Sequence, residues 1–287
     1  LINKLSATDS RVLVTGPTGS GKELVARKIH KNSDRSKNPF IVLNGASLQP
    51  ENYELELFGS DNKNGSITYG FLEKAANGTL LIDEVSEIPL ETQAKILRVL
   101  IDQKFKRING SKDIHVNIRI ISSTSKDLKS EVSIGNFRED LFHRLNVFNI
   151  NIDPLSKRID DIPLLVDYFL KHMCKNYNIK LFSINDSSYL LNYSWPGNVR
   201  ELRNLIERVV ILSQGQSEQQ ILNVIKESIS SKDSDKKFSI TDSLAIPLRE
   251  ARENFEKEYL TTQIKKFGGN ISKTAKFVGM ERSALHR

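Results

Sequence analysis

The 287-residue sequence predicts an α/β fold in which a parallel sheet is covered by helices on both faces, followed by all-helical segments. Near-continuous apolar runs predict five buried strands, at residues 12–15, 40–44, 79–83, 118–122 and 148–152. Helical patterns lie between them, at residues 22–31, 90–101 and 139–145. Apolar strands that alternate with helices are typical of parallel sheets buried on both sides. After residue 154 the strand pattern stops.

A glycine-rich stretch joins the first strand to the first of these helices. It has the spacing G-x-x-x-x-G-K of a phosphate-binding loop and consists of Gly16, Pro17, Thr18, Gly19, Ser20, Gly21, Lys22 and Glu23. Glycines let backbone N–H groups turn toward an anion, the helix N-terminus adds partial positive charge, and Lys22 would reach the outer phosphates. The alternative is a glycine-rich turn without a ligand. Glu23 stands where the general motif has Ser or Thr.

Polar residues at the carboxyl ends of the strands predict the rest of a nucleotide site, because ligands of such sheets bind at that edge. Gly16, Asn44, Asp83 and Thr124 fall at strand ends. We expect Asp83 to hold Mg²⁺ beside the phosphates and the adjacent Glu84 to deprotonate an attacking water. The alternative is a pair of acids that caps the following loop.

Three arginines could place positive charge near a terminal phosphate. Arg138 and Arg144 are six residues apart, which would put them about two helical turns apart and close to one helix face. Arg200 begins a later helix and could reach a phosphate from the helical region. The alternatives are two surface arginines and a surface pair of Arg200 with Glu201.

The chain after residue 155 is predicted to be helical. One helix opens behind Asp160 and Asp161, which can cap it, and the residues that follow at helical spacing are Leu164, Leu165, Tyr168, Phe169 and His172. Another helix follows residue 198, with the apolar face Val199, Leu202, Leu205, Ile206, Val209 and Val210. The predicted domains are an α/β core (1–155), a helical lid (156–230), a polar linker (231–243) and a truncated C-terminal domain (244–287).

The C-terminal segment has the pattern of consecutive short helices. A long amphipathic helix from Leu244 ends at Gly268 and Gly269, a second covers residues 270–278, Gly279 makes a tight turn, and a third begins at Glu281. This spacing predicts a helix-turn-helix, with a plain helical hairpin as the alternative. Residues 244–287 hold nine Lys and Arg against five Asp and Glu, within a net charge of +7. That excess fits an anionic partner such as DNA, or an ordinary solvated face.

Composition excludes several classes of protein. Hydrophobic residues make up 38% and charged residues 27%, which is typical of a soluble globular chain. The lone cysteine, Cys174, excludes an internal disulfide and a cysteine metal cluster. No apolar run approaches the ~20 residues of a membrane span and no signal peptide is visible, so we expect a cytoplasmic location. The chain starts inside a helical pattern and stops without a helix cap, so we expect both ends to be cut from a longer protein.

Four stretches together resemble the AAA+ ATPase of NtrC-type bacterial enhancer-binding proteins, the sigma-54-interaction family. They are residues 16–23, 83–95, 137–141 and 195–202. Residues 268–287 resemble the Fis-type DNA-binding domain of the same proteins, and their sequence is most similar to that of the NtrX branch. The resemblance covers essentially the whole chain. It implies an AAA+ P-loop core, an all-α lid and a Fis-type helix-turn-helix.

The resemblance also implies ATP and Mg²⁺ as ligands, with a role for each matching residue. Glu23 matches the family's own phosphate loop. Asn44 matches the residue that restrains the catalytic Glu84 in a nucleotide-dependent switch. Thr124 matches the first half of the first nucleotide sensor, whose second half is usually Asn and is Ser125 here.

Assembly and DNA binding follow from the same resemblance. Arg138 and Arg144 match arginine fingers that act on a neighbouring subunit's nucleotide, which implies a ring, usually a hexamer. Arg200 matches the second nucleotide sensor. The implied DNA contacts are Ser272, Lys273 and Thr274 on backbone phosphates, and Arg282, Ser283, His286 and Arg287 on base edges. The long helix is expected to pair with its twin in a dimer that binds a two-fold site.

Members of the family usually carry an N-terminal receiver domain that a histidine kinase phosphorylates, which fits the expectation that this chain is cut from a longer protein. One departure from the family bears on function. Its members carry, after the equivalent of Gly59, a loop with the hexapeptide Gly-Ala-Phe-Thr-Gly-Ala that touches sigma-54. Here residues 60–69 are shorter and polar and lack the aromatic residue between small ones, which predicts a flexible turn and argues against contact with sigma-54.

The chain is therefore predicted to be a two-component regulator of transcription that binds DNA and binds and hydrolyses ATP. One alternative is an AAA+ remodeller without a DNA target. The other is an ATP-binding, DNA-binding repressor that does not hydrolyse ATP.

Overall fold

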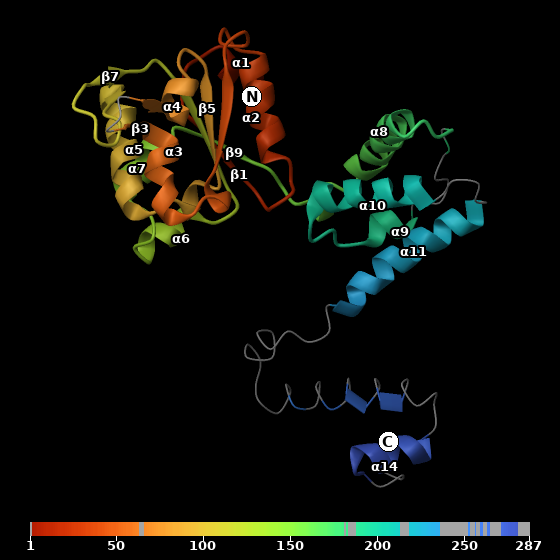
Figure 1. Cartoon of the computed structure of the whole chain (residues 1–287). Helices are drawn as coiled ribbons and strands as arrows, with labels where there is room; N and C mark the ends of the chain where they lie inside the picture. The colour runs from red at the N-terminus through yellow and green to blue at the C-terminus, as the bar shows by residue number, and fades with distance from the viewer. Residues whose placement is uncertain are drawn as a thin grey trace. The chain divides into compact units, whose positions relative to one another are not determined.

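The computed structural model describes residues 2–62, 66–180, 182, 188–212, 218–235 and 271–280, with residues 252, 256, 259, 260, 263 and 264. The chain divides into two compact units, Leu1–Leu222 and Asn223–Arg287. Figure 1 shows the sheet, its covering helices and the helical region that follows it along the chain. Over the residues that are described, no helix combines the length and the apolar character needed to cross a bilayer.

Five parallel strands form the main sheet, in the order β2-β5-β8-β1-β9. They are β1 (Val12–Thr15), β2 (Phe40–Asn44), β5 (Thr79–Asp83), β8 (Arg119–Thr124) and β9 (Phe148–Asn151). The parallel sheet predicted from the apolar runs is confirmed, and the bounds of β1, β2 and β5 agree with the prediction. β8 runs to Thr124, past the predicted end, because its polar last residues are buried as fully as its apolar ones.

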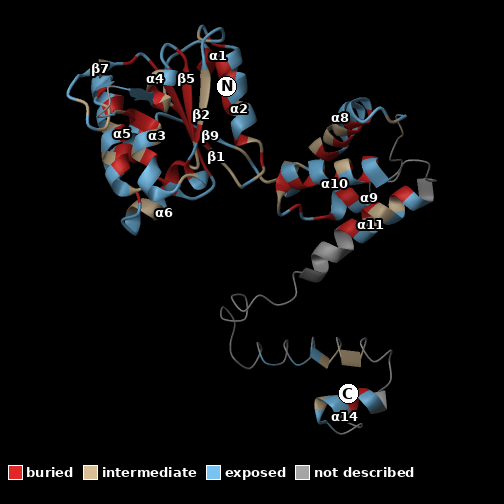
Figure 2. Ribbon diagram, viewed as in Figure 1, coloured by how far each residue is buried: buried red, intermediate tan, exposed pale blue. Residues whose placement is uncertain are grey.

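The central strands β5, β8 and β1 are buried along most of their length, and β1 and β5 are largely red in Figure 2. The edge strand β9 is largely exposed, so the prediction of a buried strand there is wrong. Leu80 and Ile82 belong to the core on one side, whereas Leu81 and Ile121 belong to the core on the other. Alternation along a strand sends neighbouring side chains to opposite faces, and every face therefore needs apolar residues. The covering helices are α1 (Ile2–Ser6) and α2 (Lys22–Lys31) on the second side, and α3 (Tyr53–Phe58), α5 (Leu90–Asp102) and α7 (Glu139–Leu145) on the first.

Two short hairpins extend from this core. One pairs β3 (Gly59–Asp61) with β4 (Ile67–Tyr69), and the other pairs β6 (Lys104–Phe105) with β7 (Ile114–His115). The prediction of a flexible turn for residues 60–69 is wrong at its two ends, which are strands, while residues 63–65 lie outside the described part. The remaining short elements are η1 (Gly45–Ser47), η2 (Pro50–Asn52), α4 (Phe71–Lys74), η3 (Val85–Glu87) and α6 (Leu128–Ser133).

The helical region packs around α10. Its elements are η4 (Leu155–Lys157), α8 (Asp161–Asn176), α9 (Ser188–Asn192), α10 (Asn198–Leu212) and the beginning of α11 (Glu218–Asp235). The predicted apolar face of α10 is confirmed, since Leu202, Leu205, Ile206, Val209 and Val210 are buried.

The residues that the sequence places at helical spacing in α8 do not form its buried face. Leu164 and Tyr168 are 73% and 60% exposed, and the buried residues are Ile162, Val166, Leu170, Met173 and Cys174. The helix carries apolar residues on more than one face, and α10 packs against only one of them. Asp160 is the N-cap residue, yet its side chain makes no capping hydrogen bond.

In the second unit, α14 (Ile271–Val278) agrees with the predicted helix over 270–278. Gly279 has φ 74°, a left-handed conformation that favours glycine, and its N–H donates to the carbonyl of Ala275. α11 continues to Asp235, inside the segment predicted as a linker. Arg252 and Glu256 form an i,i+4 ion pair of 2.9 Å, as expected on a helix.

Candidate nucleotide-binding site

The glycine loop between β1 and α2 has the backbone of a phosphate cradle. Gly16, Gly19 and Gly21 have φ angles of 150°, 78° and 105°, which side chains disfavour. A Cβ on Gly19 would lie 2.3 Å from the carbonyl oxygen of Gly197, so only glycine fits there. Gly21 is the N-cap of α2, and the free N–H groups of this helix end face the loop.

Lys22 is the cation of this loop. It is 6% exposed, and its Nζ donates to the carbonyl of Gly16 at 2.9 Å and pairs with Glu84 Oε1 at 3.0 Å. The buried hydroxyl of Ser20 has no hydrogen-bond partner among the described residues. The Lys22 ammonium and the unpaired hydroxyl of Ser20 are hydrogen-bond donors of the kind that a phosphate group needs, and they lie beside glycines with positive φ angles. The residues present therefore fit a nucleotide phosphate.

Glu84 follows β5 directly, with φ 51° in the left-handed region. Its Oε2 accepts hydrogen bonds from the backbone N–H and the hydroxyl of Ser125, both at 2.8 Å. Burial acts to raise the pKa of Glu84, but the bonds from Ser125 and Lys22 outweigh it and hold the pKa below its ordinary value. The side chain is therefore a carboxylate with both oxygens engaged.

The other strand-end residues lie where the topology predicts. Asp83 is opposite Asn44 in the β2–β5 pair and accepts a hydrogen bond from the hydroxyl of Ser123. Asn44 uses its side-chain oxygen to cap the backbone N–H of Ala46 at 2.9 Å. Thr124 is fully buried and donates to the hydroxyl of Ser86 at 3.1 Å. Asp83, Asn44 and Thr124 therefore stand at the carboxyl-end edge of the sheet.

The described residues contain no cluster of three or more His, Cys, Asp or Glu that could hold a metal ion. Mg²⁺ does not require such a cluster, because it is often bound by one or two carboxylates together with substrate phosphates. Asp83 beside the loop fits that mode. Glu23 forms an exposed ion pair with Arg27 at 2.6 Å, one helical turn away.

The two arginines before and within α7 lie on the surface. Arg138 is the N-cap residue with extended backbone, so it precedes the helix and the predicted spacing of two helical turns does not apply. Its guanidinium pairs with Asp140 at 2.7 Å, and both side chains are nearly half exposed. Arg144 is exposed in the last turn of α7.

The helical region contacts the phosphate loop through residues that the sequence analysis did not single out. Asn198 is buried, donates from Nδ2 to the carbonyl of Thr18 at 3.0 Å, and accepts from the N–H of Leu155 at 2.8 Å. Arg158 donates to the carbonyl of Ser20 at 3.3 Å. A signal for Asn198 existed, because an Asn after Pro-Gly is typical of a left-handed residue, and its φ is 52°.

The backbone N–H of Arg200 donates to the carbonyl of Gly19 at 3.2 Å, so its main chain lies beside the loop. The alternative of a surface pair between Arg200 and Glu201 is wrong. Glu201 is 8% exposed, and its carboxylate accepts from the N–H of Gly197 at 2.8 Å and the hydroxyl of Tyr193 at 3.2 Å. This carboxylate therefore shapes the turn that meets the phosphate loop.

The predicted DNA-binding residues are only partly described. Ser272, Lys273 and Thr274 lie on α14, where Lys273 is exposed and Thr274 is fully buried. Because Thr274 is fully buried, its side chain offers no exposed surface to a DNA phosphate. Four further predicted contacts lie outside the described residues: Arg282, Ser283, His286 and Arg287.

Three family models match the chain in succession. The Sigma-54 interaction domain matches residues 1–151, the AAA+ ATPase lid domain matches residues 156–237, and the Fis family of bacterial regulatory proteins matches residues 251–287. The chain belongs to the sigma-54 interaction family.

Relatives in this family are similar over the whole chain. The nitrogen assimilation regulatory protein NtrX of Azorhizobium caulinodans is 44% identical over all of this chain and 64% of its own, and a putative NtrX-like response regulator of Rickettsia typhi is 46% identical over all of it and 62% of its own. The crystal structure of NtrX from Brucella abortus in complex with ATP is 47% identical with a TM-score of 0.76, covering all of this chain and 64% of that one. The chain thus spans under two thirds of these relatives' length.

In this member of the family, Arg107 joins the two hairpins. Its guanidinium binds Glu73 through two bonds of 2.8 and 2.7 Å and Asp61 at 3.0 Å, and it lies 5.3 Å from the ring of Tyr69. Ile108 adds backbone bonds to the β3 strand, of 2.9 and 3.0 Å. The β3 strand and Tyr69 of β4 are therefore fastened to the hairpin after α5.

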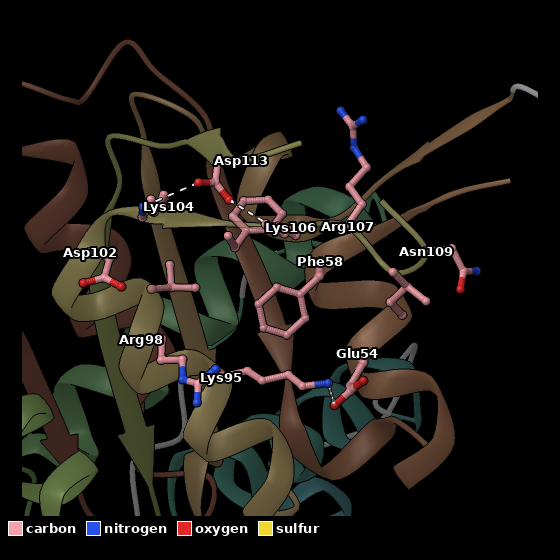
Figure 3. Close-up of a pocket in the computed structure, with 13 residues that line it drawn as sticks. Glu54, Phe58, Lys95, Arg98, Asp102, Lys104, Lys106, Arg107, Asn109 and Asp113 are labelled. Carbon is pink, nitrogen blue, oxygen red and sulfur yellow. Dashed lines mark hydrogen bonds and ion pairs between the residues drawn. The ribbon is translucent and has the colours of Figure 1, made fainter. Parts of the chain in front are cut away.

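A cavity of about 530 Å³ lies between α3, α5 and β6 (Figure 3). Its charged side chains pair largely with one another: Lys95 with Glu54, and Lys104 and Lys106 with Asp113. None of the predicted site residues lines it. Charges that are already paired give an anion little reason to bind there.

Proposed function

We propose that the chain is the ATP-binding and DNA-binding part of a two-component regulator of transcription, and that it hydrolyses ATP. The proposal rests on the ion pair between Lys22 of the glycine loop and Glu84 at the end of β5, because this pair places a cation and a carboxylate where terminal phosphates would lie. The likeness to an NtrX solved with ATP supports it.

In this proposal each residue of the site has one task. The loop N–H groups and Lys22 hold the phosphates, and Asp83 holds Mg²⁺, which would neutralise charge on the phosphate oxygens. Glu84 accepts the proton of an attacking water. Asn198 and Arg158 keep the loop in shape by bonding the carbonyls of Thr18 and Ser20.

Arg138 and Arg144 complete the site of a neighbouring subunit in a ring, which we propose is a hexamer. Their exposure supports this, since water screens a surface ion pair such as Arg138–Asp140 and the pair can be exchanged for a phosphate contact. ATP turnover per subunit should therefore rise with protein concentration. Arg138→Ala and Arg144→Ala should remove that rise, and Arg208→Ala, an exposed arginine on α10, should keep it. Turnover independent of concentration would exclude the trans role.

We further propose that α14 and the residues after it bind DNA as a dimer on a two-fold site. Lys273, exposed on α14, supports this as a phosphate contact. Duplexes selected from a random pool by the full chain should bind Lys273→Ala more weakly, with a smaller salt slope, and bind the control Lys171→Ala on α8 like the wild type. Equal binding by both variants would remove the helix from the interface.

The output differs from that of family members that drive sigma-54. Residues 60–69 lack the hexapeptide, and Arg107 supports the proposal because it fastens this segment to the next hairpin. We propose that the chain regulates promoters by occupying DNA, under control of a receiver domain and its histidine kinase. Open complexes formed by sigma-54 polymerase with this chain and ATP would contradict it.

A further inference from the structure

The surface of α1 and α2, which cover the same side of the sheet, carries an excess of positive charge (Figure 1). Residues 24–38 hold five Lys and Arg against one Asp, and α1 adds Lys4 with no acid. Two of these cations, Arg27 and Arg35, already form ion pairs within the chain, of 2.6 and 2.9 Å. The charge that remains for a partner therefore lies on lysines.

Four lysines of this surface are exposed, and we call them the basic face: Lys4, Lys28, Lys31 and Lys37. Among the residues that the structure describes, no carboxylate lies within ion-pair distance of any of these four ammonium groups. Lys28 and Lys31 are three positions apart, so they lie on one face of α2. Asn32 donates from its side chain to that of Asn3 at 3.3 Å, which places Lys4 of α1 near the end of α2.

The side chains beside the basic face are short and polar. Those that are exposed include Asn3, Asn32, Ser36 and Asn38. Interfaces between proteins are depleted in Lys and Ser and rely on aromatic, Met and Arg side chains. The phosphates of DNA are instead contacted by Lys together with Asn and Ser. The composition of this surface therefore favours a nucleic acid backbone over an acidic protein as its partner.

Two of these lysines also suit the helix that carries them. Lys28 and Lys31 lie in the last turn of α2, where the partial negative charge of the helix end favours a cation. This effect does not account for Lys4 and Lys37, because both lie outside α2. Stability of the helix and binding of a partner therefore have to be measured separately.

We propose that the basic face binds the phosphate backbone of DNA without reading its sequence. The contact adds to the one proposed for α14, and the choice of DNA as the partner rests on the proposed function. Lysine ammonium groups are mobile point charges that follow a backbone, whereas base edges are read by planar groups that bond at two points. The α/β core then contributes to affinity for every duplex and not to the choice among duplexes.

Binding of labelled duplexes to the full chain, followed by fluorescence anisotropy, tests this with one duplex selected by the chain and one of random sequence. Lys28→Ala combined with Lys31→Ala removes two phosphate contacts. The slope of the logarithm of the association constant against that of the salt concentration should become less steep by about 1.8, since each contact contributes about 0.9. The affinity gap between this variant and the wild type should narrow about tenfold between about 50 and 200 mM salt, for both duplexes alike.

Two matched variants accompany this one. Lys28→Arg combined with Lys31→Arg keeps both charges and should restore the slope. Lys157→Ala combined with Lys175→Ala removes two exposed lysines from the helical region and should leave the slope unchanged. Thermal unfolding of each variant measures its stability. If the loss of Lys28 and Lys31 unfolds the chain, the same change of slope is expected from alanine at the other two lysines of the basic face, outside α2.

The outcomes separate this inference from the proposed function. A wild-type chain that binds neither duplex would overturn both. Wild-type binding with a slope that the double alanine variant of α2 leaves unchanged would overturn the inference alone. A change seen only with the selected duplex would also overturn it, because the contact would then depend on sequence. So would an equal change in the variant of the helical region, because any loss of two charges would then suffice.

Discussion

Replacing Arg107 by methionine should destabilise the first unit more than any exposed charge replacement. Arg107 and Glu73 are each 13% exposed and share two short bonds, so removing the cation leaves a carboxylate nearly buried and unpaired. Breaking a buried pair in this way costs about 3–5 kcal/mol. Asp61 is 35% exposed and adds less, because water screens it.

For a unit of this size the loss corresponds to a fall in Tm of about 6–20 °C. Thermal unfolding followed by circular dichroism measures it, with Lys104→Met as the matched control. Lys104 pairs with Asp113 at 3.5 Å, both are 44% exposed, and its loss should cost about 0–1 kcal/mol. Adding Glu73→Gln to Arg107→Met should recover part of the stability, because it removes the orphaned charge. Equal effects of Arg107→Met and Lys104→Met would refute the account of Arg107 as the fastening of the two hairpins.

Three further predictions concern other buried polar groups. Burial lowers the pKa of His30, and the charges of Arg119 and Arg27 act in the same direction, so the unfolded chain binds the proton more tightly than the folded chain does. The contribution of His30 to the free energy of unfolding should therefore be complete above the ordinary pKa of 6.5 and should be lost below it. The variant His30→Gln should flatten the dependence of Tm on pH in that range. Asn198→Gly keeps the left-handed backbone but leaves the N–H of Leu155 unsatisfied, which should cost about 1–3 kcal/mol in urea unfolding, and Asn198→Ala should cost more. Lys22→Met should abolish ATP binding in calorimetry, whereas Arg27→Met on the same helix should not.

Much of the α/β unit could be predicted from the sequence because its strands are buried on both faces. A strand such as Leu80-Leu81-Ile82 must be apolar at every position, and that continuous run is visible without a structure. Parallel pairing then brings the carboxyl ends of the strands to one edge, where β8 lies between β5, which ends at Asp83, and β1, which leads into the phosphate loop. The helix face of α8 could not be predicted in this way, because apolar residues lie on several of its faces and only packing against α10 selects one.

The residues of the candidate site also differ in how far the sequence alone could predict them. The residues of the glycine loop follow one another in the sequence, as do Asp83 and Glu84, and local spacing was enough to find each group. Asn198 meets Thr18 across 180 positions, and Ser125 meets Glu84 across 41. Such contacts between distant positions depend on how strands and helices come together, and a short polar side chain gives no periodic pattern to mark it.

The pairing of Lys22 with Glu84 has a consequence for how ATP would bind. Both side chains are largely buried, so either one alone would be an unpaired charge of low solvation. A phosphate must therefore offer Lys22 more than Glu84 does. The bonds from Ser125 would lower that requirement, because they would keep Glu84 ionised and hydrogen-bonded once Lys22 turned to a phosphate.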